Sequence, residues 1–92
     1  MATWLRKIRA RRRLGLEDRL GHLQRQIRGI ESESAYLREM IQRCAVESAE
    51  APDDALDTRM AHLTDELRRS TEFLRVLIAE ELALRRRLGI TS

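Results

Sequence analysis

The sequence predicts an all-α protein: an antiparallel two-helix coiled-coil hairpin that dimerises into a helical bundle. Apolar residues recur at heptad spacing over two long stretches, which indicates a coiled coil. A break around the only proline, Pro52, separates the two stretches. Charged residues make up 36% of the 92-residue chain and aromatic residues only 3%. A globular core built on large side chains is therefore not expected.

The first 15 residues do not continue the heptad pattern. Extrapolating the heptads backwards places Arg6, Arg9 and Arg13 at positions that should be apolar. The phase of the pattern breaks at Gly15, and glycine weakens helices. We therefore expect residues 1–15 to be a separate basic N-terminal segment, such as a short helix hinged onto the hairpin.

The first helix of the hairpin is predicted to span residues 16–48. Its apolar seam consists of Leu16, Leu20, Leu23, Ile27, Ile30, Ser34, Leu37, Ile41, Cys44 and Ser48. The helix should end before a turn at residues 49–54, because a proline disfavours the helical conformation of the residue before it. In that turn, Asp53 or Asp54 can cap the helix that follows.

The second helix is predicted to span residues 55–88, followed by a tail at residues 89–92. Its seam consists of Leu56, Met60, Leu63, Leu67, Ser70, Leu74, Leu77, Glu81, Leu84 and Leu88. Gly89 is suited to the C-terminal cap, where a left-handed backbone conformation is common. Three arginines in the last turn oppose the negative end of the helix dipole.

The two seams match each other in an antiparallel register. Leu16 pairs with Leu88 at one end, and the two central serines, Ser34 and Ser70, fall opposite each other. This match favours a hairpin within one chain, about 50 Å long at about 1.5 Å per residue. Two open helices that pair between chains would use the same pattern, so that alternative stays open.

The predicted rod has one positive and one negative end. Six basic residues crowd the N-terminal segment, and the antiparallel fold brings three more to the same end. These candidate anion-binding residues are Arg6, Lys7, Arg9, Arg11, Arg12, Arg13, Arg85, Arg86 and Arg87. The opposite tip carries Glu47, Glu50, Asp53, Asp54 and Asp57. Because a dense positive patch attracts phosphates and acidic surfaces, we expect an anionic partner, either nucleic acid or an acidic protein.

Several apolar residues are not needed for the seam. These candidate interface residues are Tyr36, Met40, Phe73, Val76, Ile78 and Leu82. A lone hairpin would expose them, and exposed apolar patches usually mark interfaces. We expect two hairpins to pack as a homodimer, with a groove for a partner's helix as the less common alternative.

The sequence contains none of the usual catalytic or metal-binding signatures. His22 and His62 fall on different helices, and neither has a second ligand at metal-binding spacing. Cys44, the only cysteine, lies on the seam and is interpreted as a buried filler. A helical-bundle enzyme of the chorismate mutase type would need more polar residues pointing inward. We therefore predict a non-enzyme with no catalytic residues, no metal and no cofactor.

No stretch of the sequence could span a bilayer or serve as a signal peptide, so we expect a cytoplasmic protein. A membrane partner is not favoured. The one interpretation that would involve a membrane docks Trp4, Leu5 and Ile8 on its surface with the arginines around them. That apolar stripe is very short.

Part of the first helix carries Glu31, Arg38 and Gln42 at spacings that resemble the cyclic di-GMP motif of an actinobacterial family of anti-sigma factors. That motif runs Glu, Ser four residues on, Arg three further, Gln four further and Asp four further. Here Ala35 replaces the Ser and Val46 replaces the Asp.

The second helix matches the same motif at its first two places, Glu66 and Ser70, whereas Phe73 and Leu77 replace the Arg and Gln. Members of the family are antiparallel two-helix coiled coils that bind the dinucleotide and sequester a flagellar-type sigma factor. The resemblance therefore implies cyclic di-GMP as the ligand and a sigma factor as the partner.

The leading functional prediction is a non-enzymatic adaptor or regulator that presents its basic end to a macromolecular partner. A cyclic di-GMP-responsive anti-sigma factor is the sharper alternative. A purely structural oligomerisation subunit is a third possibility, and it expects no ligand. A phage-type DNA-packaging adaptor also fits the outline, by analogy of fold alone.

Overall fold

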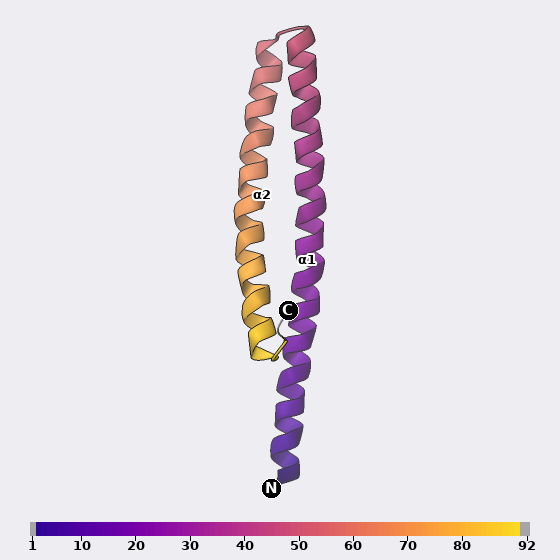
Figure 1. The fold of residues 1–92 in the computed structure, drawn as a ribbon, viewed down its shortest axis with the longest axis vertical. Coiled ribbons are helices and arrows are strands. Elements are labelled where there is room, and N and C mark those ends of the chain that lie inside the picture. The colour runs from indigo at the N-terminus through magenta and orange to yellow at the C-terminus, as the bar shows by residue number, and fades with distance from the viewer. Residues whose placement is uncertain (1, 91–92) are drawn as a thin grey trace.

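The computed structural model describes residues 2–90 and contains two long antiparallel helices joined into a hairpin (Figure 1). Helix α1 (Ala2–Glu50) and helix α2 (Asp54–Arg87) lie side by side, connected by residues 51–53. The molecule measures 75 × 21 × 14 Å, so it is a flat rod with two broad faces. The predicted all-helical hairpin is confirmed. Of the predicted segments, residue 1 and the end of the tail, residues 91–92, lie outside the described residues.

The predicted seam forms the interface between the helices. Every seam position is buried or half-buried. One core cluster contains Leu20, Leu23, Ile27, Leu77, Leu84 and Leu88. Full burial of such a side chain contributes about 1.5–3 kcal/mol. Cys44 is 2% exposed and fills the seam as predicted.

Both ends of α2 are capped by residues that the sequence singled out. The Asp53 carboxylate accepts a hydrogen bond from the Ala55 backbone N–H at 3.0 Å. Gly89 has a φ of 74°. Its N–H donates to the Arg86 carbonyl at 3.1 Å, and the Ile90 N–H donates to the Arg85 carbonyl at 2.8 Å. This pair of bonds is the Schellman motif, which satisfies carbonyls that the helix end leaves free.

The expected hinge at Gly15 is wrong. Helix α1 runs through Gly15 without a break, so residues 1–15 are not a separate element where they are described. Glycine costs a helix about 1 kcal/mol relative to alanine, which is too little to end one among strong helix formers. The change of heptad phase therefore marks where packing ends, while the helix continues. The turn is also shorter than predicted, because α1 continues to Glu50, two residues before Pro52, and α2 begins at Asp54.

The middle of the seam contains a polar defect. Ser34 is 3% exposed, and its hydroxyl has no hydrogen-bond partner among the described residues. Ser70, which the register places opposite, is half-buried. A buried hydroxyl without a partner loses its hydration without compensation. The centre of the rod is therefore less favourably packed than the leucine layers near its basic end.

Candidate functional site

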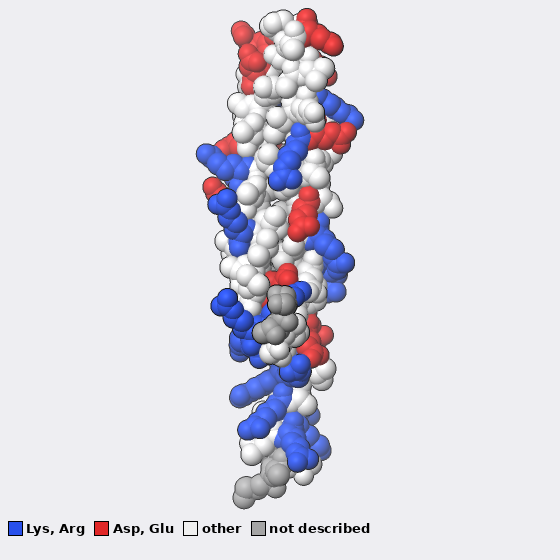
Figure 2. All heavy atoms as spheres, viewed as in Figure 1, with Lys and Arg blue, Asp and Glu red and all other residues white. Residues whose placement is uncertain are grey.

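The N-terminal part of α1 projects beyond the end of α2 as a single helix (Figure 1). We call residues 2–15 the basic extension; at about 1.5 Å per residue it is about 20 Å long. Arg6, Lys7, Arg9, Arg11 and Arg12 are all exposed. No acidic residue precedes Glu17 in the sequence. Figure 2 shows basic side chains gathered around this end of the rod.

Arg13 joins the basic extension to the paired part of the hairpin. Its Nη1 donates to the Leu88 carbonyl at 3.2 Å, at the C-terminal end of α2. Its Nε donates to Glu17 Oε1 at 3.1 Å. Arg13 therefore helps to cap α2, and part of its charge is compensated within the chain. Of the six basic residues predicted in this segment, it is the least suited to an external anion.

The three arginines at the end of α2 lie at the base of the basic extension. Arg86 and Arg87 are exposed. Arg85 is half-buried, and its Nε lies 3.0 Å from Glu81 Oε1 in an ion pair without hydrogen-bond geometry. The antiparallel fold thus places these arginines at the basic end. By the register they lie more than ten residues along the rod from Arg6, about 16 Å.

The other end of the rod is acidic, as predicted. Glu47, Glu50, Asp53, Asp54 and Asp57 are all exposed around the turn. Figure 2 shows acidic side chains at this end, with the basic residues concentrated at the other. The two ends of the molecule therefore carry opposite charge.

Heptad positions assign most exposed side chains of the paired helices to one of the two broad faces. With Leu20 and Leu23 at positions a and d, positions g and c share one face, and positions e and b share the other. Arg19 and Glu80, both at position g, form an ion pair from α1 to α2 with an N–O distance of 3.9 Å. This pair shows that the g positions of both helices lie on the same face. We call the face of the g and c positions face I, and the face of the e and b positions face II.

The predicted interface residues do not form one surface. Tyr36, Met40, Phe73 and Val76 lie at g and c positions on face I, whereas Ile78 and Leu82 lie at e and b positions on face II. Met40 is half-buried, and the other five are 40–60% exposed. Face I therefore carries both aromatic residues of the set.

The residues of the nucleotide motif are also divided. Glu31, Arg38 and Gln42 are exposed along face II of α1. Glu66 lies on face I, and Ser70 is half-buried in the seam. The three matches on α1 thus share a surface, and the two on α2 do not join them.

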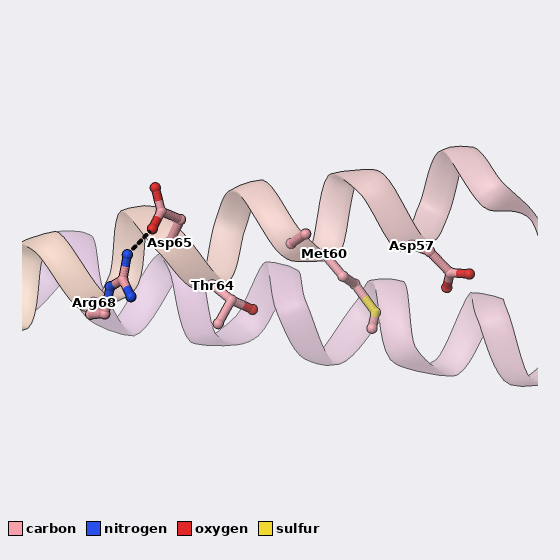
Figure 3. A pocket seen from close by; sticks show the side chains of 6 residues that line it. Asp57, Met60, Thr64, Asp65 and Arg68 are labelled. Atoms are coloured by element: carbon pink, nitrogen blue, oxygen red, sulfur yellow. Dashed lines mark hydrogen bonds and ion pairs between the residues drawn. The ribbon is translucent and has the colours of Figure 1, made fainter.

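A shallow hollow of about 490 Å³ runs along face II of α2 near the acidic tip (Figure 3). It is lined by Asp57, Met60, Ala61, Thr64, Asp65 and Arg68. Arg68 is paired with Asp65, which compensates the charge of both groups. The short side chains of Ala61 and Thr64 leave this space open. Small residues at these positions were the sequence feature that could have indicated it.

Within residues 2–90, no group of three or more His, Cys, Asp or Glu side chains is placed to hold a metal ion. Neither α1 nor α2 contains a stretch that is long and apolar enough to cross a membrane, as far as these helices are described. Comparisons with protein-family models, with curated proteins and with solved structures gave no match to this chain.

Proposed function

We propose that the protein is a non-enzymatic, homodimeric binding module whose basic extension binds the phosphates of a nucleic acid. One observation carries this proposal. Six basic residues lie within eight positions of a helix that projects past α2, and no acidic residue precedes Glu17. Phosphate contacts of this kind release counterions and supply most of the affinity of sequence-independent binding.

Apart from the Arg13–Glu17 ion pair, the charges of the basic extension do not stabilise its own helix. Arg9 and Arg13 are four residues apart, as are Lys7 and Arg11, and like charges at this spacing are destabilising. The N-terminus of a helix already carries the positive end of the dipole, and the first turn of α1 contains no acidic residue. Helix-end compensation explains the arginines at the end of α2, but it does not explain these.

The shape of the basic extension favours nucleic acid over an acidic protein surface. At 100° per residue, its basic side chains point to several sides of the helix, with Arg6 and Arg9 on one side and Lys7 and Arg11 on another. A flat acidic surface would contact one side only. The major groove of duplex DNA is about 12 Å wide, admits a helix, and has phosphates along both walls.

The direct test is a titration with short duplex DNA, followed by the emission of Trp4, which lies in the basic extension. Affinity should fall steeply with salt. The triple variant Arg9→Gln/Arg11→Gln/Arg12→Gln should weaken binding and reduce the slope of log K against log salt by about 0.9 for each phosphate that the variant no longer neutralises. It leaves Arg13, which helps to cap α2, in place.

The matched control is Arg25→Gln/Arg28→Gln/Arg75→Gln. It also removes three exposed arginines and lowers the net charge of +3 by the same amount, but on the paired part of the rod. Equal losses of affinity for the two triple variants would mean that net charge alone drives binding, and would overturn the assignment to the basic extension. If the protein does not bind DNA at low salt, the nucleic-acid proposal is wrong, and an acidic protein partner or a purely structural role remains.

A second proposal, a cyclic di-GMP-responsive anti-sigma factor, is supported by the shared exposed face of Glu31, Arg38 and Gln42. An arginine can bond a phosphate or stack on guanine, and a glutamate can accept from the guanine edge. Cyclic di-GMP should then raise the melting temperature, and Arg38→Ala should abolish that shift. An unchanged melting temperature at saturating dinucleotide would end this proposal.

A further inference from the structure

We propose that face I is the contact surface of the homodimer, and that the two copies lie antiparallel, so that the acidic tip of each meets the basic end of the other. This inference rests on the dimerisation proposed above and is independent of nucleic-acid binding. Three features of the described residues support it: the apolar content of face I, an unexplained glycine on that face, and the opposite charges of the two ends.

Gly29 is a glycine that the single chain does not need. It lies at position c on face I, between the levels of Phe73 and Val76 in the hairpin register. Its φ is not positive, and a Cβ built on it meets nothing within 4 Å. Alanine there would stabilise the helix by about 1 kcal/mol. The close approach of another helix is a reason to keep a glycine at such a place.

An antiparallel pair can use Gly29 directly. If the twofold axis is perpendicular to the long axis of the rods and parallel to their broad faces, helix α1 of one copy packs over helix α1 of the other. In the register that places Tyr36 over Gly29 of the second copy, each aromatic ring covers a position without a side chain. Tyr36 is 60% exposed in the single chain. The two Phe73 side chains then lie within about 5 Å of each other along the rod, at about 1.5 Å per residue.

The same register brings opposite charges together. On face I, Glu50 becomes level with Gly15 of the second copy, beside Arg12, and Glu47 becomes level with Asp18, beside Arg19. A parallel pair would instead set the two basic ends side by side. Like charges on those two ends would repel each other. Charge therefore selects the antiparallel arrangement.

The overlap is large enough for a stable dimer. Residues 15–50 of the two α1 helices would lie alongside each other over about 50 Å. With a rod 21 Å wide, this overlap buries on the order of 1,000 Å² per copy, against about 800 Å² in a standard interface. The outer part of the basic extension would project past the second copy's tip at each end. The dimer would then carry two separate basic ends.

The first experiment measures mass in solution by sedimentation. The wild-type chain should have twice its 10.8 kDa mass. Phe73→Ala/Val76→Ala, on face I, should raise the dimer dissociation constant at least about tenfold. The matched control Ile78→Ala/Leu82→Ala removes two exposed apolar side chains from face II and should leave the dimer intact.

A glycine variant separates association from folding. Gly29→Gln adds a good helix former where the single chain has open space, so it should raise the stability of the hairpin. The added side chain occupies the place assigned to Tyr36 of the second copy, so the same variant should weaken the dimer. A variant that folds more stably and still dimerises with wild-type affinity would overturn the proposed packing.

A distance between copies tests the orientation. Asp18→Cys in a Cys44→Ala background gives one labelling site on the outer side of α1. Spin labels should be about 45 Å apart in the antiparallel dimer, and no more than roughly 30 Å apart in a parallel one, at 1.5 Å per residue. If the wild-type chain is a monomer, both the proposed homodimer and this inference are wrong. A dimer with the short distance, or one broken only by the face II variant, would overturn this inference alone.

Discussion

Helix α1 contains two regions that share one backbone and differ in what supports them. Residues 16–50 pack against α2 through the seam, with Leu20, Leu23 and Leu37 buried. Most of the basic extension projects past α2, and three of its apolar residues, Trp4, Leu5 and Leu14, are 48–66% exposed. A continuous helix in the structure therefore does not mean uniform stability along it.

The basic extension is helical because it grows from a helix that already exists. Isolated helices shorter than about 12–15 residues are marginal in water, since nucleation is costly. Propagation from the paired region avoids that cost, but like charges four residues apart oppose it. We expect backbone amides of residues 5–12 to exchange hydrogen much faster than those of residues 20–44. Equal protection in the two regions would contradict this difference.

The largest effect should come from truncating the seam. Leu37→Ala should lower the free energy of unfolding by about 2–5 kcal/mol, because Leu37 is 4% exposed and its truncation leaves a cavity. Leu14→Ala removes the same atoms from a side chain that is 60% exposed, and should change stability by less than about 0.5 kcal/mol. Urea unfolding followed by circular dichroism measures both. Similar effects of the two substitutions would show that the extension is packed in solution.

Proline substitutions should have the next largest effect on stability, and that effect should differ between the two regions. Gly29→Pro should destabilise the hairpin by about 3 kcal/mol or more, because it breaks α1 where the helix must stay paired. Gly15→Pro can be accommodated by unfolding the basic extension. It should reduce the helical signal while the unfolding midpoint changes little. A large fall in the midpoint for Gly15→Pro would mean that the extension is part of the cooperative unit.

A gain in stability should come from the defect in the seam. Ser34→Ala removes a buried hydroxyl that has no hydrogen-bond partner among residues 2–90, and should stabilise the hairpin by about 1 kcal/mol or more. Ser32→Ala, at an exposed position two residues away, gains only helix propensity, about 0.5 kcal/mol. Thermal unfolding compares the two. A fall in stability for Ser34→Ala would show that the hydroxyl finds a partner in solution.

The smallest effect concerns the joint between the regions. Arg13→Gln should cost about 1 kcal/mol, since it removes the hydrogen bond to the Leu88 carbonyl. Arg12→Gln removes no such hydrogen bond in the described structure, and should leave stability unchanged or slightly higher because one like charge is removed. Denaturant midpoints for the two variants should therefore differ. Identical midpoints would show that Arg13 does not contribute to the C-terminal cap of α2.

Much of the fold could be predicted from local patterns. The heptads identified every buried seam position, and the caps at Asp53 and Gly89 followed from residue types with known conformational preferences. The division of apolar residues between faces I and II could have been deduced from the same heptads. The predicted hinge at Gly15 was wrong because an apolar pattern can end while its helix continues. Helix propagation through an exposed glycine leaves no such pattern.

Heptad spacing, one proline-marked turn and the distribution of charge determined that this chain forms a hairpin with opposite ends of opposite charge. These properties can be read from residue types and their spacing along the chain. Tertiary structure alone decided that Arg13 reaches the Leu88 carbonyl and that the Ser34 hydroxyl lacks a partner among the described residues. It also decided that Arg19 pairs with Glu80 across face I. Such contacts depend on how two surfaces meet in three dimensions, where ångström-scale distances decide whether polar atoms find each other.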